Sequence, residues 1–144
     1  MSTPRVFTLE EANKTLPYVR RVVTDLVRDY HAWQSTLAEF DIAQARRRAA
    51  EDGGPGDAGE AVRLERHAAV LAKAIESYLA EIAAVGAEVK GFGEGLVDFP
   101  GEMDGRSIRW CWMLGEPAIE HWHDEASGFA GRQRIGGVPA LPRG

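Results

Sequence analysis

The sequence contains only one cysteine, Cys111, among its 144 residues. A single thiol excludes an internal disulfide and is typical of proteins that stay in a reducing compartment. Long apolar runs are also missing. The first residues lack an apolar stretch of secretory length, and no window approaches the ~18 apolar residues that a membrane span needs. We therefore expect a cytoplasmic protein that does not enter a membrane.

An excess of positive charge is absent as well. The chain has 17 Lys and Arg against 22 Asp and Glu, a net charge of −5 and an isoelectric point near 5.4. Because binding to phosphate backbones needs a basic face, this balance argues against a general affinity for nucleic acid. We interpret the one basic run, residues 46–48, as a solvated helix end. With 44% hydrophobic and 27% charged residues, the chain has the composition and length of one globular domain, residues 1–144.

The helical part begins with a capping signal. Thr8 is followed three residues later by Glu11, the spacing of a capping box, which predicts a short helix from residue 9. Leu16-Pro17 then predicts a break, because the residue before a proline is disfavoured in the α region while proline suits the first turn of a new helix. A second helix is expected from residue 17.

Two long segments share the helical period. Apolar residues recur at spacings of three and four, which is typical of one helix face. In the first segment they are Val19, Val22, Val23, Leu26, Tyr30, Trp33, Leu37 and Phe40, and in the second Leu64, Ala68, Leu71, Ile75, Leu79, Ile82 and Val85. We predict helices over 17–50 and 60–86, joined by a Gly- and Pro-rich loop at 51–59, with the second ending near Gly86 or the Gly91/Gly93 pair.

Helices of this length are expected to pair as a coiled-coil-like antiparallel hairpin over residues 9–86. A lone hairpin leaves part of each apolar stripe exposed to water. Either the C-terminal segment packs along it or a second copy completes a bundle. We therefore expect a homodimer formed through the helices.

After Gly91 the sequence changes to short apolar runs separated by Gly and Pro, which predicts a β-module over 91–127. A strand at 96–99 should stop at Pro100, a turn at Asp104-Gly105 should lead into a strand over 106–114, and 118–123 is a candidate third strand. Residues 128–144 are expected to be an irregular tail. The predicted class is α+β, mainly α: a short N-terminal helix, a long helical hairpin and a two- to three-stranded antiparallel segment.

Several short motifs resemble one family. They are FTLEEAN at 7–13 with LP at 16–17, GLVDFP at 95–100, DGR at 104–106, CWMLGE at 111–116, WH at 122–123 and GFAGRQ at 128–133. Together they resemble the bacterial family of uncharacterised proteins DUF2203 over nearly the whole chain. The resemblance implies a small intracellular protein, and it assigns no activity and no functional residue.

The densest group of possible metal ligands lies at residues 116–125. If 119–123 is extended, His121 and His123 share one strand face, and two imidazoles so spaced can bind one metal ion. If it is helical, Glu120 and His123 share a face instead. Glu116, Asp98 or Cys111 could supply a third ligand, with Glu116 favoured because a Gly-Glu-Pro turn can fold it back. Histidine with carboxylate suits zinc or non-haem iron.

Other interpretations remain open. The histidines can be purely structural, which leaves a helical-hairpin interaction or assembly protein without chemistry. A pocket for a small ligand is the third possibility. Its candidate lining residues are Asp98, Arg106, Arg109, Trp110, Cys111, Trp112, Trp122 and Arg132, although Trp110 and Trp112 are better explained as core residues. Cys111 should point away from these tryptophans. Arg109 could lower its pKa, but a buried or idle thiol is the favoured interpretation.

Overall fold

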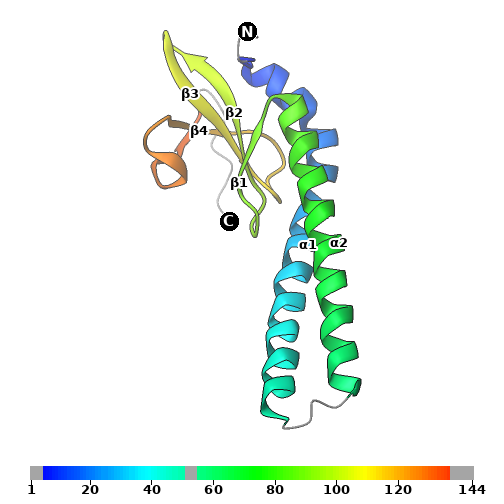
Figure 1. Cartoon of the computed structure of the whole chain (residues 1–144). Helices are drawn as coiled ribbons and strands as arrows, with labels where there is room; N and C mark the ends of the chain where they lie inside the picture. Colours follow the sequence, from blue (N-terminus) through cyan, green and yellow to red (C-terminus); the bar gives the residue numbers. More distant parts are fainter. Residues whose placement is uncertain (1–4, 51–54, 137–144) are drawn as a thin grey trace.

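The computed structural model of the chain describes residues 5–50 and 55–136. Two long helices form an antiparallel hairpin, and five antiparallel strands in the order β1-β2-β3-β4-β5 form one sheet (Figure 1). The sheet lies beside the end of the hairpin nearest the N-terminus, and the other end extends beyond it (Figure 1). The predicted class, mainly α with a C-terminal β-segment, is confirmed, but the sheet is larger than the two or three strands expected.

Helix α1 (Leu9–Ala49) is continuous, so the predicted break at Pro17 is wrong. The predicted capping box is confirmed: the Glu11 amide donates to Thr8 Oγ1 at 3.0 Å, and the Thr8 amide donates to Glu11 Oε1 at 2.8 Å. An interior proline costs a helix about 3 kcal/mol. Leu16 and Val19, on either side of Pro17, are buried in the main core. This packing holds both halves of the helix in line.

Helix α2 (Pro55–Val85) begins earlier than the predicted residue 60. Residues 55–59 of the expected loop are therefore helical, because proline is well tolerated in a first turn, where its missing N–H has no helical partner anyway. Residues 51–54, the remainder of that loop, lie outside the described residues. The end near Gly86 is confirmed. Gly86 has a φ of 105°, the left-handed region that glycine adopts without strain.

The sheet consists of β1 (Glu88–Gly91), β2 (Leu96–Met103), β3 (Arg106–Met113), β4 (His121–Asp124) and β5 (Gln133–Arg134). The predicted strand over 106–114 is confirmed within one residue, whereas β4 begins three residues later than the predicted third strand. The short β1 was not predicted.

Pro100 lies inside β2 rather than ending it, which corrects the prediction. Its carbonyl accepts from the Phe7 amide at 2.8 Å. The Pro100 nitrogen therefore also faces Phe7 and not β3, because N and O of one strand residue point the same way. Since β1 pairs with β2 only as far as Glu88 opposite Asp98, no ladder bond is lost at the proline.

The expected irregular tail is partly regular. It contains the 3-10 helix η1 (Gly128–Gly131) and β5. Ile135 is buried in the main core, and its amide donates to the Glu120 carbonyl at 3.0 Å. Residues 137–144 lie outside the described residues.

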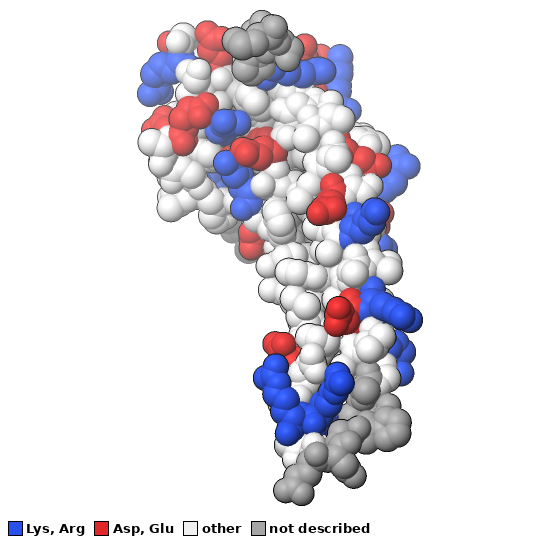
Figure 2. Space-filling model, in the orientation of Figure 1, with Lys and Arg blue, Asp and Glu red and all other residues white. Residues whose placement is uncertain are grey.

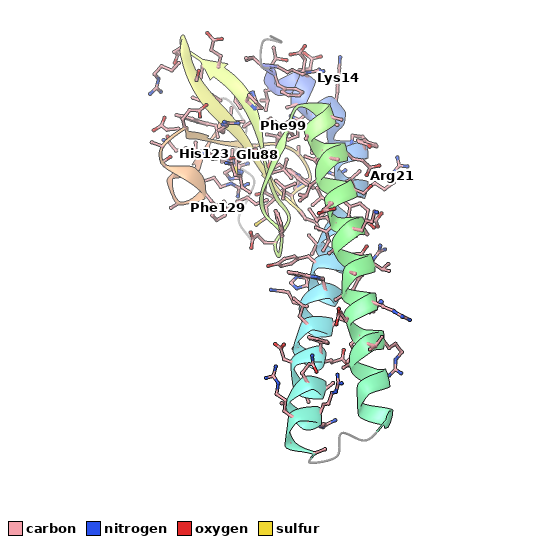
Figure 3. The ribbon with its side chains drawn as sticks, in the orientation of Figure 1. Lys14, Arg21, Glu88, Phe99, His123 and Phe129 are labelled. Carbon is pink, nitrogen blue, oxygen red and sulfur yellow. The ribbon has the colours of Figure 1, made fainter. Side chains whose placement is uncertain are left out.

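The two faces of the sheet differ. One face packs on the helices and contributes Val97, Phe99, Ile108, Trp110, Trp112 and Trp122 to a core that also includes Val19, Val23 and Ile82. Trp110 is fixed there by a 2.8 Å hydrogen bond from its Nε1 to the Phe7 carbonyl. The core role expected for Trp110 and Trp112 is confirmed. The opposite face, turned away from the helices, carries the polar residues described next (Figure 3).

Candidate functional site

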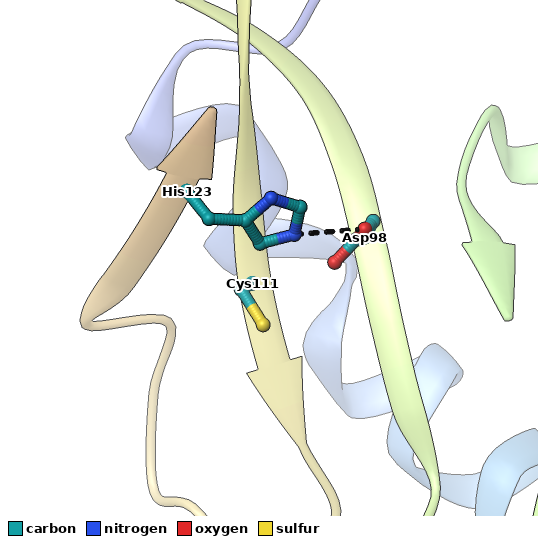
Figure 4. A group of neighbouring side chains, drawn as sticks. All are labelled: Asp98, Cys111 and His123. Atoms are coloured by element: carbon teal, nitrogen blue, oxygen red, sulfur yellow. Dashed lines mark hydrogen bonds and ion pairs between the residues drawn. The ribbon is translucent and has the colours of Figure 1, made fainter. Parts of the chain in front are cut away.

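Three polar side chains from three adjacent strands are buried together on this second face. Asp98 on β2, Cys111 on β3 and His123 on β4 are 2%, 0% and 3% exposed. Asp98 pairs directly with Cys111, and Arg109, two residues before Cys111, pairs with His123. Opposite residues and residues two apart share a sheet face. The strand register therefore brings the three side chains together (Figure 4).

The hydrogen bonds of His123 define its protonation pattern. Nδ1 lies 2.7 Å from the Asp124 carbonyl oxygen, which can only accept, so Nδ1 must carry a hydrogen. Nε2 lies 3.0 Å from Asp98 Oδ2 (Figure 4). One proton must therefore lie between Nε2 and Oδ2, and the pair has no net charge.

The second oxygen of Asp98 is less well satisfied. Oδ1 is buried and has no hydrogen-bond partner among the described residues. A buried acceptor without a partner costs about 1–3 kcal/mol, and such atoms are rare in folded proteins. Asp98 Oδ1 is therefore one of the few buried polar atoms of the described residues whose hydrogen bonding is incomplete.

Cys111 is not an activated nucleophile. Burial, followed by the negative charge of Asp98, raises the pKa of its thiol to about 12, and the nearby Arg132 only partly opposes this shift. The favoured interpretation, a buried thiol, agrees with the structure, and the alternative in which Arg109 lowers its pKa is wrong. Without a metal ion, the thiol is neutral at physiological pH.

Ligand atoms of Asp98, Cys111 and His123 all lie within 4.8 Å of one another. Ligand atoms 2.0–2.3 Å from a tetrahedral zinc ion are about 3–4 Å apart. The three groups therefore need only a small contraction to share one ion. Among residues 5–50 and 55–136, these are the three His, Cys, Asp or Glu side chains whose ligand atoms lie close enough together to hold one metal ion.

The structure divides the expected trio of His121, His123 and Glu116. His121 and His123 do share a face of β4, but His121 Nδ1 is directed to Glu116 Oε2 at 3.7 Å, whereas His123 bonds to Asp98. Glu116 is held by the Met113 amide and by Arg132. Burial, followed by the charge of Arg132, lowers the pKa of His121 below 6.5, which favours the neutral imidazole at neutral pH. Of the residues named as possible third ligands, Asp98 and Cys111 are those that reach His123.

A pocket of about 380 Å³ opens above Asp98 and His123, between the sheet and the segment after β4. Lys90 and Arg109 supply positive charge to its lining, and Glu125 supplies negative charge. Leu96 and Phe129 form apolar walls, and residues 126–128 complete the lining. Asp98 and His123 are thus buried but adjoin a space that a small molecule can enter.

The pocket residues named from the sequence are distributed over both faces. Asp98 and Arg109 line the pocket, and Cys111 lies beside them, whereas Trp110, Trp112 and Trp122 pack in the core. Arg132 binds Glu116 and the Cys111 carbonyl, and Arg106 pairs with Asp124 at 3.8 Å. Lys90 and Phe129 were not expected at a site, and Glu125 was named only as a member of the group of possible metal ligands at 116–125. No local motif marks them, since only the strand pairing and the turn after β4 bring them to the pocket.

The fold and this site define a class of protein: a helical hairpin with a small antiparallel sheet whose outer face holds a buried Asp/Cys/His cluster. A family model described as "Uncharacterized conserved protein (DUF2203)" matches residues 5–135. The chain belongs to the DUF2203 family, as its motifs predicted. No curated protein and no solved structure matches the chain. Neither described helix is both long and apolar enough to cross a membrane.

Proposed function

We propose that the protein binds one zinc ion through Asp98, Cys111 and His123, and that the ion serves the adjoining pocket. The observation that carries this proposal is the convergence of the three ligand atoms within 4.8 Å in a buried site. The unpaired Asp98 Oδ1 supports it, because a bound metal ion would give this buried carboxylate the partner that it lacks.

The orientation of His123 favours metal binding. Its Nδ1 hydrogen is donated to a backbone carbonyl, which is the usual second contact of a metal-bound histidine. This contact directs Nε2, the other ring nitrogen, toward Asp98 and the centre of the cluster. A thiolate, an imidazole and a carboxylate together suit zinc better than magnesium or calcium, which prefer oxygen ligands alone.

Charge balance also favours a divalent ion. Before binding, the thiol and the Asp98–His123 pair are both uncharged overall. A zinc ion displaces the thiol proton and the proton shared between Nε2 and Oδ2. The thiolate and the carboxylate then carry two negative charges, which the ion neutralises. Binding therefore adds no net charge to the buried site, which avoids the large penalty of an isolated buried ion.

The number of ligands points to a catalytic type of site. Structural zinc sites are usually closed by four protein ligands, whereas catalytic sites use three and leave one position for water or substrate. The pocket above Asp98 and His123 offers space for that fourth ligand. An ion held by these residues would act as a Lewis acid beside the pocket, so metal-assisted hydrolysis is the reaction class that the site would support.

Calorimetric titration of metal-free protein with zinc tests the proposal. We expect one zinc per chain with a dissociation constant below about 10 µM. Cys111→Ser keeps the shape of the side chain but replaces the thiolate ligand. It should weaken zinc binding by more than about 100-fold, because losing only a hydrogen-bond partner of a metal ligand already costs up to about 100-fold. His123→Ala should do the same, but it also leaves Asp98 buried without its partner, so its fold must be checked by circular dichroism.

His121→Ala is the matched control, since this residue lies on the same strand and the same face but is directed to Glu116. It should bind zinc as the unchanged protein does. If the wild type binds no tighter than about 10 µM, or if Cys111→Ser binds equally well, the proposal is wrong. If His121→Ala alone abolishes binding, the site formed by His121, His123 and Glu116 takes its place.

A further inference from the structure

We propose that the pocket binds a small organic anion, with its carboxylate or phosphate group held between Lys90 and Arg109 and a second oxygen on the metal ion. This inference rests on the proposed zinc site and names the class of substrate that the site would take.

Arg109 is fixed beside the metal ligands by the strand register. It pairs directly with His123 across β3 and β4, and it precedes Cys111 by two residues on the same face. Its side chain is 24% exposed and reaches Glu125 at 3.4 Å on the pocket rim. A guanidinium in this place can donate two parallel hydrogen bonds to an anion bound above the cluster.

Lys90 comes to the pocket through an irregularity of β1. The pairing register shifts between Val89 and Gly91, so Lys90 is the extra residue of a β-bulge. Bulges redirect side chains and are over-represented beside functional sites. Lys90 lines the pocket, and its Nζ meets Glu88 at 2.8 Å.

The charges of the lining favour an anion. With zinc bound, the cluster is neutral, and the lining residues Lys90, Arg109 and Glu125 carry one net positive charge. Glu88, which lies opposite Asp98 and pairs with Lys90, balances this charge until an anion replaces it. The ion pairs from Lys90 to Glu88 and from Arg109 to Glu125 involve side chains that are partly exposed to solvent. Pairs of this kind contribute little energy, so an incoming anion can replace them.

The apolar walls and the volume of the pocket indicate the size and polarity of the remainder of the ligand. Leu96 and Phe129 lie on the pocket lining, and the Phe129 side chain is 46% exposed. Figure 3 shows Phe129 on the same side of the sheet as His123. An apolar group of the ligand can cover this ring, while its charged end reaches Lys90 and Arg109. A volume of about 380 Å³ suits a small metabolite rather than a polymer.

Cobalt-substituted protein provides the test, because the visible spectrum of cobalt reports both metal binding and changes in its ligands. The probes are benzoate, phenyl phosphate and the uncharged benzamide, which share one ring. We expect at least one of the two anions to change the spectrum at lower concentration than benzamide does, and a comparison of the two identifies the preferred charged group. Arg109→Gln and Lys90→Met should each weaken anion binding by about tenfold or more without reducing cobalt binding.

Arg106→Gln is the control, since Arg106 lies on the same strand but pairs with Asp124 outside the pocket. It should bind the anions as the unchanged protein does. If cobalt binds but benzamide acts as strongly as the anions, or if Arg109→Gln binds them equally well, the anion site is wrong and the metal site stands. If cobalt does not bind at all, both proposals are wrong.

Discussion

Single residues decide how the two helices are joined in the middle of the hairpin. Tyr78 on α2 donates a 2.7 Å hydrogen bond to Asp29 on α1, and Arg28 donates to the same carboxylate at 2.9 Å. The bond from Arg28, with a smaller contribution from Tyr78, lowers the pKa of Asp29 below its ordinary value of 3.8. The charged form of Asp29 is therefore favoured in the folded state.

This shift predicts a pH dependence of stability. A lowered carboxylate pKa stabilises the fold above the unfolded value of 3.8, and the contribution is lost as the pH falls through the folded value. Tyr78→Phe should lower the free energy of unfolding by about 1 kcal/mol at neutral pH, because it removes one bond to a charged group. Urea unfolding at neutral pH and below 3.8 measures the difference. A difference between the two proteins that stays constant over this range would contradict the account.

At the scale of elements, the long helices could be predicted from the spacing of their apolar residues, and two prolines mark where local rules failed. Pro17 and Pro100 were expected to end elements, yet α1 and β2 continue through them. In each case tertiary contacts decided the outcome: core packing around Pro17, and the segment at Phe7, which bonds to the Pro100 carbonyl where β1 no longer pairs with β2. The β1 strand was missed because Val89 is its one large apolar residue, so no alternation marks the segment as a strand.

The proline in α1 should reduce stability. Pro17→Ala restores the backbone donor that an uninterrupted helix uses, and it should raise the free energy of unfolding by about 1–3 kcal/mol. Pro17 is exposed, so no packing is lost. Denaturant unfolding measures the change, with Tyr18→Ala as a control at the neighbouring exposed position. A destabilised Pro17→Ala protein would show that the proline shapes α1 rather than straining it.

The expected homodimer stays a prediction, and exposed apolar side chains on the helices are where a second copy could bind. Ile42, Val62 and Val70 are 53%, 44% and 66% exposed. Figure 2 shows uncharged surface along one side of the middle of the hairpin, with charged side chains of both signs beside it and several Lys and Arg side chains near its far end. Leu26 and Leu71 belong to the apolar stripes of the two helices, but they are 0% and 9% exposed within the single chain. Replacing them with charged residues would therefore disturb folding and would not test self-association.

Val70→Glu and Ile42→Glu are therefore the better tests. If a second copy covers these residues, light scattering should report a dimer for the wild type and a monomer for either variant, with unchanged helical circular dichroism. Tyr18→Glu, which changes an exposed position outside this region, should remain dimeric. A wild-type monomer at high micromolar concentration would exclude self-association through the hairpin.

For the whole molecule, the candidate site could be predicted only in part. Alternation along β4 correctly placed His121 and His123 on one face, and the sequence named Asp98 and Cys111 among possible partners. It could not show that the register sets Asp98 beside Cys111, or that Arg132 holds Glu116 next to His121. Such pairings arise between strands whose relative position is set by the core on the other face, and single-strand periodicity contains no information about them.

Asp98, Cys111 and His123 are the proposed ligands of the metal ion. The most direct measurement is X-ray absorption spectroscopy at the zinc edge, on protein loaded with one zinc ion per chain. The account predicts one sulfur at about 2.3 Å and two or three nitrogen or oxygen neighbours at about 2.0–2.2 Å, with the sulfur lost in Cys111→Ser. A first shell of nitrogen and oxygen alone would contradict it.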